Sequence, residues 1–438
     1  MRGPNRREFL KKAGKVACPS HRISKKVNMK RSAYFLMPFL CLSIMTCWGC
    51  STGSAPAPSG PSGFKEADIK ELIGKFGPVL HMHPDEKYGL GNPEDILNRS
   101  SLHLGIVNES EWGSNWDDRK AYDKFNISHG THFANITAAT LMNQVNDMLG
   151  NVKPKAPYNN SDDFRYWIEY PDSLKPGHNK TAKALVRVLP VNVTNQELTE
   201  IQFWFYYPFN DPGRLWFRAA SGIGACEVKA PGIKLNCEEN LDRYGRHYGD
   251  WEYVSLLIRN ATKNLVMVAM SRHGRMSFFE CEGGVCKNRD DSSEKVEFET
   301  DGHPRVYSAI NSHAIYNRED NRWVSKRAFS FNYRIGTVSA DIIDRTKMGE
   351  AFEAWKPERY RIVGSTLPGY KVTLPDWMNF GGRWGRYEKL KENVFEIQGW
   401  KVIGWYHMDW AYTQRGVGAG PRSPDLKEES VFKGLIGN

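Results

Sequence analysis

The chain has no excess of either charge sign once its first 50 residues are set aside. Eleven of the 60 Lys and Arg residues and one of the 50 Asp and Glu residues lie in that leader, which leaves 49 of each sign in the rest of the chain. The formal charge of +10 therefore belongs to the leader. Because binding to nucleic acid depends on clustered positive charge, the neutral body argues against a nucleic-acid partner.

Several catalytic signatures are also missing. The sequence contains no GxSxG nucleophile elbow, no HExxH zinc motif, no Walker phosphate loop and no GxGxxG dinucleotide fingerprint. Their absence removes the enzyme classes that depend on them. We therefore favour a binding protein over an enzyme, with enzymatic activity left open.

The sequence also lacks a hydrophobic run long enough to span a membrane comfortably. Its apolar run after Lys30 and Arg31 is about fifteen residues long, which is typical of a signal peptide. The run ends at Cys50 and resembles a bacterial lipoprotein signal, in which that cysteine is lipidated and becomes the mature N-terminus. We expect an exported, membrane-anchored protein of the cell envelope, with cleavage without lipidation as the alternative. Because NRREFLKKAG upstream resembles a twin-arginine signal, either Met1 or Met29 is the start.

Cysteine is scarce beyond the leader, where only Cys226, Cys237, Cys281 and Cys286 occur. An even number of cysteines in an exported body favours two disulfides. Cys281 and Cys286 flank a Gly-Gly turn, so a local bridge between them is the simplest pairing. Zinc binding by the four thiolates is the rival, but these four have no CxxC spacing.

The body is predicted to be a single mainly β domain over residues 64–438. Residues 51–63 contain only Ser, Gly, Pro, Ala and Thr, a composition typical of a flexible linker. The apolar spacing in 65–76 predicts a helix, and a second helix is expected at 348–356. The polar stretch up to about residue 160 gives few structural signals.

Short apolar or alternating runs from about residue 183 onward predict strands separated by turn residues. Such spacing favours a β-sandwich core with a few peripheral helices. The tail from residue 357 is rich in Trp and Gly and predicts loops and turns. The expected strands are 182–191, 201–209, 252–259, 264–274 and 304–310.

Two acidic residues at the start of an apolar strand suggest a site. Asp250 and Glu252 lie two residues apart in RHYGDWEYVSLLI, so a strand would place both carboxylates on one face. They repel each other unless a cation, a basic side chain or solvent lies between them. With His247 nearby and Asp211 ending a neighbouring strand, the set offers three carboxylates and an imidazole. Calcium or magnesium suits such oxygen ligands, and ordinary pairing with arginines is the alternative.

Other histidines carry a weaker signal. His273 and His313 lie in or beside predicted strands, where a half-buried structural histidine is the usual case. His81 and His83 share a face if their segment is extended, and the acids that follow them could complete a second metal site. Loop histidines beside acids are common, so this second site is the less favoured interpretation.

Six stretches together resemble the vacuolar protein sorting-associated protein 62 family. In chain order these are PVLHMHPDEKYG, FWFYYPFN, HYGDWEYVSLLI, HPRVYSAINSHAIY, FGGRWG and GPRSP. The resemblance runs from about residue 75 to 424 and implies no particular biochemistry, since most members of that family have none assigned.

The central part is also similar to the necrosis- and ethylene-inducing peptide-like proteins, which are secreted β-sandwich cytolysins that bind sphingolipid head groups through a divalent cation. That resemblance implies a metal site at Asp211, His247, Asp250 and Glu252, with His273 as the strand histidine. Gly249 stands where that family has a second histidine, and Tyr248 stands where it has an arginine.

These observations predict an exported protein whose divalent cation, calcium or magnesium, binds a glycan or lipid head group, with His273 and His313 near the ligand. A metal-dependent hydrolase that uses Glu252 or His273 as general base is one alternative. A structural module whose ion only ties loops together is another.

Overall fold

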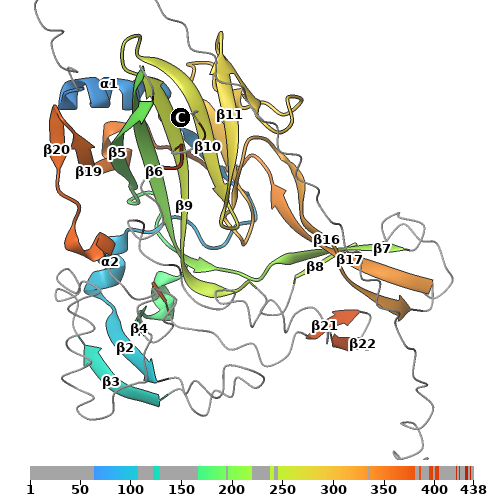
Figure 1. The fold of residues 1–438 in the computed structure, drawn as a ribbon. Coiled ribbons are helices and arrows are strands. Elements are labelled where there is room, and N and C mark those ends of the chain that lie inside the picture. The colour runs from blue at the N-terminus through green and yellow to red at the C-terminus, as the bar shows by residue number, and fades with distance from the viewer. Residues whose placement is uncertain are drawn as a thin grey trace, which may run out of the picture. The chain divides into compact units, whose positions relative to one another are not determined.

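The fold is known from a computed structural model (Figure 1). Residues Ser59–Asn438 form one compact unit of the chain. The leader with Cys50 lies outside the described residues, as do the linker 51–63 and Cys226. The structure describes residues 64–106, 122–128, 166–193, 196–219, 237–240, 245–333, 336–379, 384–385, 394–397 and 400–403, with isolated positions at 421, 424, 430–432 and 435.

An eight-stranded sheet forms the centre of the fold, as the apolar runs predicted. Its neighbouring strands are antiparallel except for one parallel pair, β5 with β19. Apolar residues occupy both faces of its central strands, as in a sheet covered on both sides. In spatial order the strands are β12 (Val285–Asn288), β11 (Arg275–Glu282), β10 (Asn264–Arg272), β9 (His247–Arg259), β6 (Gln196–Asn210), β5 (Ala184–Val193), β19 (Tyr360–Leu367) and β20 (Tyr370–Val372).

A five-stranded sheet and helix α1 (Glu66–Phe76) cover one face of this sheet. Side chains of both sheets and of α1 share one buried apolar cluster, which makes the pair of sheets a β-sandwich. The predicted helix is confirmed, with acidic residues in its first turn and Lys75 in its last. The strands of the covering sheet are β1 (Val79–Met82), β13 (Glu297–Phe298), β14 (Pro304–Ser308), β15 (Ile315–Tyr316) and β18 (Ala351–Glu353).

An aromatic cluster covers the opposite face of the eight-stranded sheet. Trp251 on β9 contacts the rings of Tyr206, Trp377 and Trp384. Two glycines allow a close backbone approach there. A Cβ on Gly249 would lie 2.0 Å from the Trp384 carbonyl oxygen. A Cβ on Gly385 would lie 2.3 Å from the backbone of Tyr248.

Smaller sheets complete the described part of the chain. No helix in that part is long and apolar enough to cross a membrane. The remaining elements are α2 (Pro93–Asn98), β2 (Ser101–Ile106), β3 (Tyr122–Ser128), β4 (Tyr166–Glu169), β7 (Arg214–Ala219), β8 (Glu238–Asn240), β16 (Asp320–Tyr333), β17 (Gly336–Thr346), β21 (Val394–Ile397), β22 (Trp400–Ile403) and three 3-10 turns, Asp172–Leu174, Pro357–Arg359 and Asp376–Asn379.

Two sequence predictions of local structure were wrong. The segment 348–356 is not a helix, because Ala351–Glu353 forms β18 and pairs antiparallel with β1. Burial of Phe352 and Ala354 in the sandwich core outweighs the helical propensity of the segment. The tail also contains strands β19 and β20 where only loops were expected.

The local disulfide is confirmed. Cys281 and Cys286 face each other across the β11–β12 hairpin and are bonded. Cys237 is also disulfide-bonded, while Cys226 lies outside the described residues.

Candidate functional site

Asp250 and Glu252 project from β9 onto the face that the second sheet covers. They pair in register with Tyr207 and Phe205 of β6, which belong to the sandwich core on that face. Each acid is 8% exposed. Trp251 between them points to the opposite face and joins the aromatic cluster. The predicted alternation of the GDWE stretch is therefore observed, and it places two carboxylates at the end of the sandwich core.

Each of these carboxylates accepts a hydrogen bond from a nearby donor. The Ser271 hydroxyl of β10 donates to Glu252 Oε2. The Trp251 backbone N–H donates to Asp250 Oδ1 over 2.9 Å, and Asp250 Oδ2 lies 3.3 Å from His313 Nδ1. Both carboxylates thus have hydrogen-bond partners within the fold.

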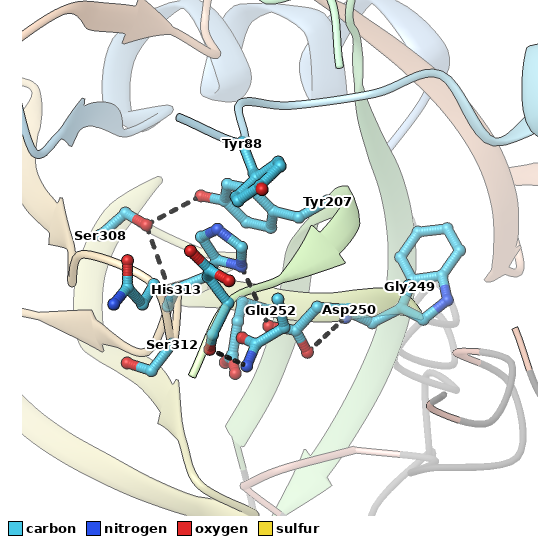
Figure 2. A network of polar contacts seen from close by, with 12 residues as sticks. Tyr88, Tyr207, Gly249, Asp250, Glu252, Ser308, Ser312 and His313 are labelled. Atoms are coloured by element: carbon cyan, nitrogen blue, oxygen red, sulfur yellow. Dashed lines mark hydrogen bonds and ion pairs between the residues drawn. The ribbon is translucent and has the colours of Figure 1, made fainter. Parts of the chain in front are cut away.

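His313 lies at the centre of the polar network (Figure 2). Its side chain is 0% exposed and stacks on the ring of Tyr207, with the ring centroids 3.8 Å apart. The Tyr207 hydroxyl donates to Ser308, whose hydroxyl donates in turn to the His313 carbonyl. His313 Nε2 is buried and has no hydrogen-bond partner among the described residues. The Oε2 atom of Glu86 lies 3.8 Å from it.

Glu86 is a member of the network that the sequence analysis did not select for this site. It follows β1 in the PDEKYG loop, and its Oε2 accepts the Asn311 backbone N–H over 2.6 Å. The charges of Glu252, Asp250 and Glu86 all raise the pKa of Tyr207, after the larger effect of burial. Three carboxylates therefore act together on this one side chain. The parallel pairing of β1 with β14 brings the Glu86 loop close to the Asn311–His313 loop, and no local pattern could reveal that.

Asp211 lies at the end of β6, next to the same network. Its backbone N–H donates to the Asn311 carbonyl over 3.2 Å. Burial raises the pKa of its carboxyl group, the charge of Arg246 lowers it, and the charge of Glu86 raises it. Asp211 and Glu86 are thus electrostatically coupled members of one acidic region.

His247 opens β9 opposite Asn210, with its Nδ1 2.6 Å from the Gly249 carbonyl oxygen. Gly249 has a φ of +68° and lies against the Trp384 backbone. No side chain fits there without movement of the backbone, so this position requires glycine.

His273 lies in the turn between β10 and β11, where the charges of Glu252 and Asp250 also act on it. Its Nε2 is 2.5 Å from Asp344 Oδ2, and Asp344 also accepts from Tyr316 and Ser312 hydroxyl groups. Burial lowers the pKa of His273, but the Asp344 charge and hydrogen bond outweigh it and raise the pKa to about 9. His273 is therefore a cation at neutral pH.

His81, on β1, and His83, just after that strand, contact different groups. His81 Nε2 lies 3.0 Å from Glu299 Oε1, whereas His83 Nδ1 accepts the Asp85 backbone N–H over 3.1 Å. Burial lowers the pKa of His83.

The side-chain atoms gathered at this site are of the types that bind a hard divalent cation. Carboxylate oxygens dominate it, and the buried His313 Nε2 lacks a partner among the described residues. In that part of the chain, no group of three or more His, Cys, Asp or Glu side chains is already arranged around a common point for an ion.

The model of the vacuolar protein sorting-associated protein 62 family matches residues 128–394, more than half of the chain. The chain belongs to this family. Both motifs that carry most of the network, GDWE and the segment around His313, lie within the matched range of this Vps62 family member.

Two solved structures resemble the fold weakly. One is necrosis and ethylene inducing protein 2 from the causal agent of cocoa's witches' broom disease, with 16% identity, a TM-score of 0.23, and coverage of 56% of this chain and 67% of that one. The other is described as a toxin fold for microbial attack and plant defense, with 14% identity, a TM-score of 0.22, and coverage of 57% and 68%. Neither likeness carries an argument about the site. Among curated proteins no match was found.

Proposed function

We propose that this end of the sandwich binds a divalent cation, calcium or magnesium, and through it a glycan or a lipid head group. The observation that carries the proposal is the shared, covered face of Asp250 and Glu252, each 8% exposed. Burying two carboxylates on one face costs free energy that a bound cation would offset. Asp211 would supply a third carboxylate and His247 an imidazole.

The electrostatics of the neighbouring residues support this proposal. Glu86 adds a carboxylate that acts on both Asp211 and Tyr207, so the region concentrates negative charge. Calcium accepts irregular sets of six to eight oxygen ligands, which suits side chains that come from separate loops. When bound, the ion would supply open coordination positions for hydroxyl or phosphate oxygens of the ligand.

Calorimetric titration of the chelator-treated protein with calcium, and separately with magnesium, tests the proposal. We expect saturable binding that weakens at least tenfold in Asp250→Asn and in Glu252→Gln. Glu282→Gln is the matched control, because it removes an exposed carboxylate on β11 of the same sheet. Absence of saturable binding in the unsubstituted protein, or an equal loss in the control, refutes the ion site.

Retention on glycan arrays and on liposomes separates the function from its alternatives. Ion-dependent retention that disappears in Asp250→Asn supports ligand binding. If the protein binds an ion but no glycan or vesicle, and chelator lowers its melting temperature sharply, the ion is structural. Turnover of a phosphoester or glycoside that is lost in Glu252→Gln would instead establish a hydrolase.

We also propose that the protein is exported and anchored through a lipid on Cys50. The disulfide between Cys281 and Cys286 supports export, because such bonds persist in oxidising compartments. Metabolic labelling with radioactive palmitate in a bacterial host tests the anchor. We expect label in the unsubstituted protein and in Cys47→Ala but not in Cys50→Ala, and unlabelled protein in the medium refutes the anchor.

A further inference from the structure

An open pocket lies beside the turn between β10 and β11, outside the proposed cation site. Its volume is about 980 Å³, which is large enough for a small organic ligand. None of its lining residues is Glu86 or one of the four proposed ion ligands. Its lining includes Arg272, His273, Arg275, Tyr316, Arg318 and Arg322.

Positive charge dominates the lining. Four arginines and the protonated His273 face two acids, Asp290 and Asp320. Arg272 and Arg322 both lie over the ring of Tyr316, with guanidinium carbons 5.5 and 5.7 Å from its centroid. The buried Tyr316 ring thus supports two guanidinium groups in one wall of the pocket.

Two of these arginines are already paired with acids. Arg322 Nη1 lies 2.5 Å from Glu294 Oε1, and Arg318 lies 3.4 Å from Asp320 Oδ2. Arg272 and Arg275, in contrast, form no ion pair with any residue that the structure describes. Their guanidinium groups are therefore the ones available to a ligand.

Arg272 and Arg275 are also forced together by the hairpin. They are directly opposite each other in the β10–β11 register and hence lie on one face. His273 and Gly274 between them have φ values of +46° and +70°, which is the conformation of a tight two-residue turn. Directly opposed like charges destabilise a sheet. An anion between the two side chains would reverse that repulsion.

We propose that this arginine pocket binds a phosphate monoester through Arg272 and Arg275. A guanidinium group can donate two parallel hydrogen bonds to phosphate oxygens, so two adjacent arginines suit a doubly charged group. The size of the pocket leaves room for the organic part of the ester beside the Arg318 and Asn321 wall. The proposal does not depend on the cation site.

Calorimetric titration with inorganic phosphate and with glycerol 3-phosphate, at low ionic strength and with chelator present, tests the arginine pocket. We expect the dissociation constant to rise at least tenfold in Arg272→Gln and in Arg275→Gln, with no detectable binding in the double variant. Arg259→Gln is the matched control, because it removes an exposed arginine at the opposite end of the β9–β10 hairpin. Its dissociation constant should stay within twofold of the original.

Sedimentation with phosphatidylcholine vesicles, with and without phosphatidic acid, identifies the source of the phosphate. Retention that requires phosphatidic acid and both arginines indicates a lipid head group, whereas binding of the soluble ester alone indicates a free metabolite. Either result supports the proposal that the arginine pocket binds a phosphate monoester. Undetectable binding of phosphate and ester by the unsubstituted protein overturns it, as does unchanged affinity in the double variant, an equal loss in Arg259→Gln, or binding that chelator abolishes.

Discussion

Replacement of Asp344 by Asn should destabilise the protein in a way that depends on pH. The Asp344 carboxylate is 4% exposed and accepts hydrogen bonds from His273, Tyr316 and Ser312. Asparagine keeps the shape and an acceptor oxygen but loses the charge that holds His273 protonated. The variant therefore isolates the ion pair from the packing around it.

The size of the effect follows from the pKa of His273. A value of about 9 in place of 6.5 corresponds to roughly 3 kcal/mol of stabilisation. The His273 side chain is 38% exposed, so screening by water reduces this to about 1 to 2 kcal/mol. Because the folded-state pKa is raised, the stabilisation is fully present below pH 6.5 and is lost as pH rises through about 9.

The free energy of unfolding, measured in urea at pH 7 and at pH 10, tests this prediction. We expect Asp344→Asn to lower the free energy of unfolding by about 1 to 2 kcal/mol more at pH 7 than at pH 10. Asp341→Asn is the control, because Asp341 lies on the same strand, β17, and pairs with Arg218 over 2.6 Å. Arginine stays charged over this range, so the cost of that variant should not change with pH. A cost of Asp344→Asn that is equal at both pH values refutes the reasoning.

Two further predictions concern a close backbone contact and a disulfide. Gly249→Ala should lower the free energy of unfolding by more than about 2 kcal/mol, because its Cβ would lie 2.0 Å from the Trp384 carbonyl oxygen. Gly274→Ala, at a similar φ, meets nothing within 4 Å and should lower it by only about 1 kcal/mol. Equal losses for the two variants in urea unfolding would contradict the close approach at Gly249. Replacing Cys281 and Cys286 together by Ser should lower the free energy of unfolding by about 2 kcal/mol, measured without reductant as a lower melting temperature than that of the unsubstituted protein. An unchanged melting temperature would show that this bond does not stabilise the fold.

The sheet strands could be predicted because their signal is local. Long apolar runs such as the one in β6 and the alternation around Asp250 follow from the two-residue period of a strand. For β18, in contrast, the local pattern predicted the wrong structure. Its Glu, Ala and Lys favour a helix, and only the edge of β1, more than 260 residues earlier, makes it a strand.

The composition of the site was only partly accessible for the same reason. Asp250 and Glu252 could be placed on one face from their spacing, and His313 was singled out as a histidine beside a strand. The part played by Glu86 could not be foreseen, since it depends on the parallel pairing of β1 and β14. Nor could the arginine pocket, because it joins the β10–β11 turn to residues of the β15–β16 region.

The reciprocal glycine contact has a practical consequence for work on this protein. Gly249 packs against the backbone of Trp384, and Gly385 packs against the backbone of Tyr248. The strand that carries Asp250 is therefore supported by residues 135 positions further along the chain. A fragment truncated before Trp384 would leave the Trp251 ring without one of its aromatic neighbours and the start of β9 without its support. A shortened chain meant to retain the acidic network should therefore extend well past this position.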